Sequence, residues 1–403
     1  MVGSRAFIYD AVRTPRSRGK RDGKLHEVKP IALGAGLLRA LQERHGLDTS
    51  RVDDVMMGCA TPVGEQGSNV AKAITQFAGW DDSIPAVQMD RFCASSLEAV
   101  NSAAQNIISG WSSMILAGGV ESMSRVPMGS NGGALLMDPE FVAQQTSVPQ
   151  GIAADMVATM GGWNREEIDS YALESQKRAG AAVSGGYFGK SVIPVVDSNG
   201  ATILAADDYL KPDTTAAQLA ALKPAFADIG AMGADEHLLK KYPRYSQINH
   251  VHTAGNSSGI VDGASVVLIG NEEIGHELGL TPRGRIVSGA VVSSDPSLIF
   301  LGPAPAAKRA LEIAGLTTAD IDLWEINEAF ASAVLRYMED LGISHDVTNV
   351  NGGAIALGHP LGATGALLVG VMLDELERRG LKRGMVSLCA AGGIGISTII
   401  ETV

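Results

Sequence analysis

The sequence predicts an α/β protein made of two similar halves, with a long insertion in the first. Apolar runs of strand length alternate with segments of helical periodicity, a pattern typical of layered α/β folds with a largely parallel sheet. The second half repeats the order of the first about 270 residues later, which indicates an internal duplication. Each half is expected to read strand, helix, strand, helix, strand.

The expected elements can be placed in order along the chain. Strands of the first half are expected at residues 7–12, 52–55, 87–91, 114–119 and 265–269. Strands of the second half are expected at residues 285–290, 321–326 and 385–389. The first helix of each half ends near Gly46 and Gly315, because glycine commonly closes a helix.

Two helices rich in small side chains follow reactive residues of the two halves. After Cys93, apolar residues recur at helical spacing from Leu97 to Ile107, and small residues fill much of the remaining surface. After His359, the run 362–373 is apolar or small on all sides, which indicates a buried helix. We therefore expect both helices to lie between the sheets of the two halves.

The stretch 121–250 has no counterpart in the second half. It contains an amphipathic helix that starts at Arg165 and ends near Gly180. Because loops on a rigid scaffold usually carry specificity, we interpret this stretch as an inserted loop domain over the mouth of the active site. The expected domains are an N-terminal half, the insertion and a C-terminal half, at residues 1–120 plus 251–281, 121–250 and 282–403.

Composition excludes several classes of protein. A net charge of -12 and a pI near 5.2 argue against a nucleic-acid partner. Three cysteines without a CxxC pair argue against a zinc site or disulfide framework, and they suit the reducing cytoplasm. We expect no metal, no signal peptide and no transmembrane segment, since the apolar run 362–373 is too short to span a bilayer.

Three reactive side chains lie among small residues. Cys93 stands between a strand and a helix, where the helix N-terminus favours a nucleophilic thiolate. His359, between Gly358 and Pro360, is placed to face a pocket as a base. Cys389 ends an apolar strand before a turn of alanine and glycine, whose N–H groups suit a developing negative charge. Each residue alone also fits a buried structural role, but the three together favour sulfur-based acyl transfer.

These segments together resemble the thiolase family over essentially the whole chain. The motifs that carry the resemblance are Arg91-Phe92-Cys93-Ala94-Ser95, Asn327-Glu328-Ala329-Phe330-Ala331, Gly358-His359-Pro360-Leu361-Gly362-Ala363-Thr364-Gly365, and Cys389 before a glycine turn. The resemblance is to the thiolase subunits of fatty-acid β-oxidation complexes above all. It implies two duplicated βαβαβαββ halves in a five-layer α/β/α/β/α arrangement.

The resemblance also implies a reaction, that of a 3-ketoacyl-CoA thiolase (acetyl-CoA C-acyltransferase). His359 would activate the nucleophile Cys93, and Cys389 would protonate the departing acetyl-CoA enolate. Asn327 would hold a water that forms one oxyanion hole with His359, and the backbone N–H groups of Cys93 and Ala391 would form the other. The CoA and substrate would lie along Ala254, Ser257, Ser258, Ala329 and Phe330.

The family further implies what the protein works with. Coenzyme A is a substrate, and neither a cofactor nor a metal is expected. A homodimer or homotetramer is implied, with a hydratase/dehydrogenase subunit as a candidate partner. The basic residues between 13 and 24 are interpreted as a solvated loop.

Two departures from the family pattern bear on the subtype. Ala391 replaces a glycine of the usual C-terminal turn, which would strain the backbone if that position needs a positive φ. Pro149-Gln150 stand where short-chain biosynthetic thiolases carry a His-Met pair, and an extra stretch lies at 230–249. The second departure points to the degradative type. We expect basic residues of the extra stretch to touch CoA phosphates or a partner subunit; they are Lys240, Lys241 and Arg244.

Three alternatives stay open at this point. A biosynthetic acetoacetyl-CoA thiolase (acetyl-CoA C-acetyltransferase) would cleave acetoacetyl-CoA and nothing longer. A decarboxylating ketoacyl synthase needs a Cys-His-His set, which Cys389 disfavours. A non-catalytic acyl-CoA carrier on the same fold has no need of a nucleophile, whereas Cys93, His359 and Cys389 are all present.

Overall fold

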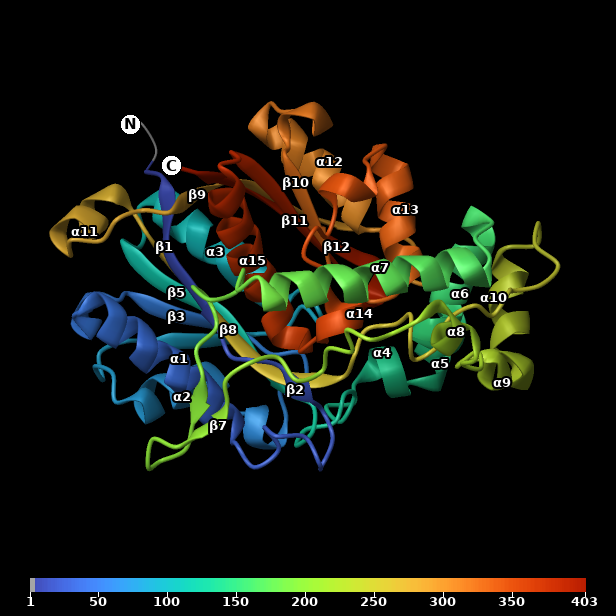
Figure 1. Cartoon of the computed structure of the whole chain (residues 1–403), viewed down its shortest axis with the longest axis horizontal. Helices are drawn as coiled ribbons and strands as arrows, with labels where there is room; N and C mark the ends of the chain where they lie inside the picture. The colour runs from blue at the N-terminus through green and yellow to red at the C-terminus, as the bar shows by residue number, and fades with distance from the viewer. Residues whose placement is uncertain (1–3) are drawn as a thin grey trace.

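A ten-stranded sheet organises the computed structural model, which describes residues 4–403 (Figure 1). Its order is β10-β11-β12-β9-β1-β8-β5-β3-β4, with β2 paired to β8 beside this path. The strands of the first half are β1 (Ala6–Arg13), β2 (Ser17–Arg18), β3 (Asp54–Gly58), β4 (Ala86–Met89), β5 (Met114–Ser122) and β8 (Val261–Gly270). Those of the second half are β9 (Gly284–Ser293), β10 (Leu323–Ile326), β11 (Arg383–Ala390) and β12 (Ile394–Thr402). The insertion adds a two-stranded sheet of β6 (Val195–Val196) and β7 (Thr202–Leu204).

The two halves are joined edge to edge by β1 and β9. These strands pair antiparallel, with Phe7 opposite Arg285. The strands predicted to form two separate sheets therefore belong to one continuous sheet. The prediction of a largely parallel sheet is also wrong, because the strands from β11 through β12, β9, β1 and β8 to β5 are all antiparallel neighbours. Parallel pairs lie toward its two ends, where β3 runs parallel to β4 and β5, and β10 to β11.

Helices on both faces of the folded sheet complete the predicted five layers (Figure 1). The outer helices α1 (Pro30–His45) and α2 (Val70–Ala78) cover the strands of the first half. On the opposite side, α12 (Pro303–Ala314) and α13 (Ala331–Leu341) cover those of the second half. Between them, α3 (Ser95–Ser109) and α15 (Thr364–Arg379) contact strands of both halves.

The central layer explains why its helices lack a polar face. All of α15 from Thr364 to Leu376 is buried, which confirms the buried helix predicted from the run 362–373. Each fully buried Val, Leu or Met side chain contributes about 1.5–3 kcal/mol relative to an exposed one. Since both faces of this layer meet sheet strands, its apolar core stabilises the two halves together.

Gly365 lets the two central helices touch near their N-termini. A Cβ at this position would lie 2.3 Å from the backbone nitrogen of Leu97, far inside van der Waals contact. One residue on, the Ala366 N–H donates to the hydroxyl of Ser96 over 3.1 Å. The close contact places the residues that precede these helices, Cys93 and His359, at the same end of the central layer.

The insertion lies along one side of the layers (Figure 1). Its long helix α7 (Arg165–Ser184) starts with the capping box of Asn164 and Glu167, and it continues past the predicted end at Gly180, where the helix accommodates the glycine. The other helices of the insertion are α4 (Ala134–Met137), α5 (Pro139–Gln144), α6 (Gln150–Gly161), α8 (Ala216–Ala220), α9 (Ala227–Ile229), the π-helix η3 (Gly230–Ala234) and α10 (Asp235–Lys241).

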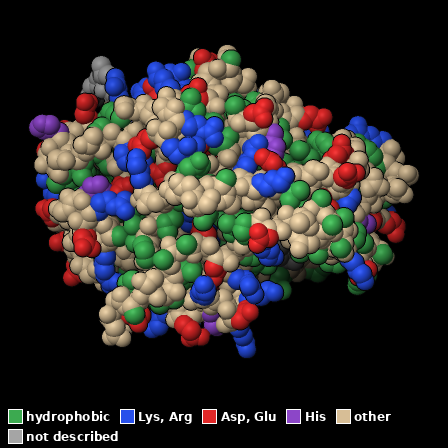
Figure 2. All heavy atoms as spheres, viewed as in Figure 1, with side chains coloured by type: hydrophobic (Ala, Val, Ile, Leu, Met, Phe, Trp, Pro, Cys, Tyr) green, Lys and Arg blue, Asp and Glu red, His purple; other side chains and the backbone are tan. Residues whose placement is uncertain are grey.

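Short elements complete the chain. The remaining α-helices are α11 (Glu272–Glu277) and α14 (Ala354–Leu357). The 3-10 helices are η1 (Thr49–Arg51), η2 (Gly64–Gln66), η4 (Thr318–Asp320), η5 (His345–Val347), η6 (Leu361–Ala363) and η7 (Ala391–Gly393). Within residues 4–403, no helix is both long enough and apolar enough to cross a membrane. Acidic and basic side chains are interspersed over the face shown in Figure 2.

A substitution at the helix contact tests its importance for stability. Gly365→Ala places a methyl group against the backbone of α3, and we expect it to destabilise the fold by about 1–3 kcal/mol, as overpacked cores do. Thermal unfolding measures the effect. The matched control is Gly36→Ala in α1, where an added Cβ meets nothing within 4 Å, and its melting temperature should stay level or rise. Equal melting temperatures for the two variants would show that α3 and α15 tolerate a wider separation.

Candidate active site

Cys93 lies in a tight turn between β4 and α3. Phe92 adopts a left-handed backbone conformation with φ 51°, which a bulky residue rarely takes. The turn is held by the Asp90 carboxylate, which accepts from the Phe92 N–H, and by the Ser95 hydroxyl, which accepts from the Arg91 N–H. Cys93 is therefore fixed one residue before the N-cap of α3, and its side chain is buried.

His359 is oriented by the start of α15. Its Nδ1 lies 2.6 Å from the hydroxyl of Thr364, and that hydroxyl donates to the carbonyl of Pro360 over 3.0 Å. Because the hydroxyl proton goes to Pro360, the oxygen of Thr364 accepts the proton of Nδ1. The lone pair of the ring is then on Nε2, the tautomer that a general base requires. The backbone N–H of His359 donates to Gly259, which fixes the loop from the other side.

Asn327 meets His359 at the end of β10. Its Nδ2 lies 3.3 Å from Nε2 of His359, within reach of a hydrogen bond. The other amide atom, Oδ1, is buried and has no hydrogen-bond partner among residues 4–403. The backbone N–H of Asn327 donates to Ser387 in the parallel strand β11, which places Cys389 nearby.

Cys389 stands at the end of β11, before the turn η7. The left-handed positions of this turn fall on Gly392 and Gly393, with φ of 74° and 77°. Ala391 does not adopt a positive φ, so the expected condition for backbone strain at this position is not met. The turn is anchored by Ser294, whose N–H and hydroxyl both donate to the carbonyl of Gly393.

Burial sets the protonation of the three reactive groups. It raises the pKa of the Cys93 thiol, with Cys389 and Glu121 adding to the shift. Burial also raises the pKa of Cys389 to about 12. For His359, burial and then the charge of Arg16 lower the pKa to about 3. Burial therefore favours the neutral form of all three groups. It opposes the thiolate that the start of α3 is expected to favour, and that expectation stays a prediction.

The residues predicted to bind CoA are largely brought together. The Ser258 N–H donates to the carbonyl of Ala329 over 2.9 Å, and Ser257 forms a bridge with Phe330. This loop continues to Gly259, whose carbonyl accepts from the backbone N–H of His359, so the loop leads directly to the predicted base. Ala254 lies apart from that bridge and is exposed at the edge of a pocket.

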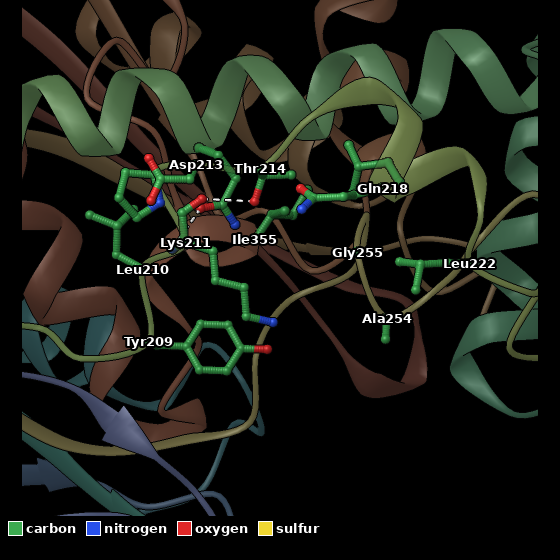
Figure 3. A pocket seen from close by; sticks show the side chains of 13 residues that line it. Tyr209, Leu210, Lys211, Asp213, Thr214, Gln218, Leu222, Ala254, Gly255 and Ile355 are labelled. Atoms are coloured by element: carbon green, nitrogen blue, oxygen red, sulfur yellow. Dashed lines mark hydrogen bonds between the residues drawn. The ribbon is translucent and has the colours of Figure 1, made fainter.

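A pocket of about 550 Å³ opens beside this loop (Figure 3). It is lined mainly by the insertion, and Ala254, Gly255 and Ile355 complete the lining. Lys211 extends over the ring of Tyr209, with its Nζ 5.6 Å from the ring centre. Sequence reasoning missed both residues. The one signal in the sequence was that an anionic ligand of an acidic chain needs a local positive charge, such as that of Lys211.

The basic residues interpreted as a solvated loop are in part buried. Arg13 and Arg16 are almost fully covered, and both pair with the carboxylate of Asp207. The interpretation is wrong for these two arginines because their partner lies in the insertion, far along the chain. It fits Arg18, which is exposed.

The basic residues of the extra stretch contact their own chain. Lys241 lies 2.6 Å from the carboxylate of Asp295, Lys240 pairs with Glu236 one turn away, and Arg244 donates to Tyr245. A role for them toward CoA or a partner stays a prediction. Within the described residues, no group of three or more His, Cys, Asp or Glu side chains is arranged to hold a metal ion.

Comparisons with known proteins bear on the whole chain. The family model described as the thiolase N-terminal domain matches residues 6–237, and that of the thiolase C-terminal domain matches residues 280–402. A 3-ketoacyl-CoA thiolase of Cronobacter sakazakii is 40% identical over 99% of this chain and 100% of the relative. The 3-ketoacyl-CoA thiolase FadA of Escherichia coli K12 is 38% identical over 98% of this chain and 99% of its own length.

Solved structures show the same similarity. The acetyl-CoA acetyltransferase of Bacillus anthracis aligns with a TM-score of 0.85 at 33% identity. Human mitochondrial 3-ketoacyl-CoA thiolase aligns with a TM-score of 0.85 at 32% identity. Each alignment covers 100% of both chains.

The protonation of Cys93 can be measured by its alkylation. A free cysteine has a pKa of about 8.5, so its alkylation rate levels off above that pH. Because burial raises the pKa of the Cys93 thiol, the rate of its reaction with iodoacetamide should keep rising above that pH. Mass spectrometry of the modified peptide gives the rate at this one residue, and Cys93→Ala identifies background labelling. A rate that levels off below about pH 7 would instead indicate a preformed thiolate, as in activated cysteines.

Proposed function

Because the chain belongs to the thiolase family, we propose that it is a 3-ketoacyl-CoA thiolase in which Cys93 forms the acyl-enzyme. Curated relatives at about two-fifths identity over the full chain carry that name. The observation that carries the proposal is the orientation of His359, whose Nε2 is left as an acceptor at the end of the central layer where Cys93 also lies. As an acyltransferase of this family, the chain takes CoA as a substrate.

In the first half-reaction, the 3-ketoacyl chain passes to the enzyme. His359 accepts the thiol proton as the sulfur of Cys93 attacks the 3-keto carbon. The bond between carbons 2 and 3 breaks, and its electron pair moves into the enolate of acetyl-CoA. Cys389 then gives its proton to carbon 2. A thiol with a pKa of about 12 suits this step, since it keeps its proton until a strongly basic carbanion forms.

In the second half-reaction, free CoA removes the acyl group. The CoA thiol gives its proton to the Cys389 thiolate, and its sulfur attacks the thioester on Cys93. The Cys93 sulfur leaves and takes back the proton that His359 holds. The first half-reaction leaves His359 protonated and Cys389 as a thiolate, and the second returns all three groups to their neutral forms, without a cofactor or metal.

Two oxyanion sites would stabilise the charged intermediates. The unpaired Oδ1 of Asn327 supports a bound water there, which with the protonated Nε2 of His359 would face the enolate oxygen. The backbone N–H groups of Cys93 and Ala391 would face the oxygen of the tetrahedral adduct. Both residues lie at element ends, where backbone N–H groups are free to bind an anion.

The path of CoA follows from the pocket beside the active-site loop. We propose that the pantetheine runs past Ala254, Ser257 and Ser258, with Ala329 and Phe330 behind it. Lys211 would then meet a phosphate of the nucleotide. The pocket lies mainly in the inserted stretch 121–250, in keeping with its proposed role as the domain that covers CoA.

Assembly and location are part of the proposal. We infer a cytoplasmic homodimer or homotetramer, with a hydratase/dehydrogenase subunit as a candidate partner. The edge strand β4 supports self-association, since it pairs with β3 on one side and exposes 39% of Val87. The chain's similarity to FadA, named as a 3-ketoacyl-CoA thiolase, supports a place in fatty-acid oxidation.

The function is tested by thiolysis of 3-ketoacyl-CoA esters with acyl chains of increasing length. We expect the purified protein to cleave long substrates with CoA, and Cys93→Ala to abolish the reaction. The second candidate, an acetyl-CoA acetyltransferase, is favoured by the similarity to the Bacillus anthracis enzyme. Cleavage of acetoacetyl-CoA alone would favour that candidate, and absence of cleavage at every length would contradict both.

Half-reactions separate the roles of the two thiols. Cys389→Ala should keep the exchange of an acyl group between acyl-CoA and labelled CoA. No enolate forms in that exchange, so Cys389 never loses its proton, and His359 alone can carry the proton between the thiols of Cys93 and CoA. Its thiolysis of 3-ketoacyl-CoA should fall by about 100-fold or more, the usual loss for a missing acid/base group. His359→Ala should lose both activities. Equal losses of exchange and thiolysis in Cys389→Ala would show that Cys389 is not the group that protonates carbon 2.

The proposed CoA path predicts a change in affinity without a change in chemistry. Lys211→Glu places a negative charge at the pocket, so KM for CoA should rise by about tenfold while kcat changes little. The control is Lys308→Glu, which makes the same charge change on the exposed surface of α12. Steady-state kinetics with varied CoA measures both. An unchanged KM in Lys211→Glu would place the nucleotide elsewhere.

A further inference from the structure

Arg16 brings a buried positive charge to the loop that carries His359. Its side chain is only 4% exposed, and its Nη1 donates to the carbonyl of Gly358 over 3.3 Å. Gly358 immediately precedes His359 and has a φ of 90° that favours glycine. The carboxylate of Asp207 accepts from the backbone N–H and from Nε of Arg16. Arg16 is thus fixed behind the proposed base.

We propose that Arg16 is a positioning residue that holds the His359 loop and opposes protonation of the imidazole in acid. The inference rests on the proposed role of His359 as the base. Arg16 itself touches neither substrate nor the reacting sulfur in this scheme. It acts through the backbone of Gly358 and through its charge.

The balance of charge around Arg16 leaves its field uncompensated. Although burial opposes ionisation of Asp207, Arg13 and Arg16 hold the pKa of that carboxyl well below its usual range. One carboxylate thus faces two guanidinium groups. Glu325 lies with Arg16 on a cavity of about 10 Å³, the size of a single water, and burial raises its pKa well above the usual range. An uncharged Glu325 does not cancel the remaining positive charge.

The other groups that face His359 carry no opposing charge. Thr364 and Asn327 are neutral hydrogen-bond partners. Cys93 and Cys389 stay protonated at neutral pH because burial raises the pKa of both thiols. Arg16 remains charged, since burial lowers its pKa only to about 10. Burial is the first cause of the low pKa of His359, and the charge of Arg16 lowers the pKa further, because a nearby cation disfavours a second positive charge.

The same arginine joins the base to the CoA pocket. The Asp208 N–H donates to the carbonyl of Arg16 over 3.0 Å, directly after Asp207. The next residues of that loop, Tyr209 and Lys211, line the pocket. The geometry of the base therefore depends on the loop that would meet the CoA nucleotide.

The test compares Arg16→Gln with Arg16→Lys and with the matched control Arg13→Gln. Arg13 is equally buried and also binds Asp207, but its hydrogen bonds go to Asp207 and Thr14 rather than to Gly358. An NMR titration with ¹³C-labelled histidine gives the pH at which half of His359 is protonated, called its midpoint here. The variant His359→Asn identifies which signal belongs to His359. In Arg16→Gln the midpoint should rise by about two pH units, as expected for loss of a nearby charge. It should stay low in Arg16→Lys, and it should rise less in Arg13→Gln, which removes one charge from the cluster but leaves Arg16 on Gly358.

A kinetic readout complements the spectra. In Arg16→Gln, kcat/KM at pH 5 should fall about twofold relative to pH 7, because about half of His359 is then protonated. Equal midpoints in Arg16→Gln and Arg13→Gln would overturn the proposal. So would a wild-type midpoint near 6.5 or above, a measurement that needs no variant to fold. Because the midpoint is read from His359 directly, it stays informative even if thiolysis is absent.

Discussion

The contact between α3 and α15 is the constraint on which the rest of the structure depends. Gly365 allows the backbones to meet, and Gly119 likewise allows β5 to reach the carbonyl of Gly362, 2.0 Å from where its Cβ would stand. The N-termini of α3 from the first half and α15 from the second half therefore lie next to each other. Cys93 comes from the first half, whereas Asn327, His359 and Cys389 come from the second. A site of this kind forms only when both halves are packed together.

The same burial that stabilises the central layer decides the chemistry of the site. Removing thiols from water disfavours their charged forms, and removing an imidazole from water does the same. Burial thus favours the neutral form of each reactive group, and in the proposed mechanism charges arise in pairs as a proton moves between them. Burial does not decide the tautomer or the position of His359, and hydrogen bonds do. Thr364 fixes the tautomer of His359, and Gly259 fixes its backbone. Because these hydrogen bonds hold the groups in place, the site does not have to reorient during the reaction as water molecules would.

The sequence was informative where structure is local. Cys93, His359, Cys389 and Asn327 stand in short motifs, and the helices around them follow from periodicity and small residues. Features set by distant pairing were not predictable in the same way. The burial of Arg16 requires Asp207 in the insertion, and the continuous sheet requires Phe7 opposite Arg285. The prediction of a largely parallel sheet also failed, because the apolar pattern of a strand does not determine which strands it pairs with or in which direction.

The insertion is bound into the site rather than laid over it. Glu328, next to Asn327, is buried and accepts hydrogen bonds from Tyr171 and Ser175 of α7, and from the backbone of Ile355. A shift of α7 would therefore move the residues that flank Asn327. Asp207 ties the other end of the insertion to Arg16 and so to the loop of His359. If the insertion binds the substrate as proposed, the pocket and the reactive groups are mechanically coupled, so a change that reshapes the pocket also affects the position of His359.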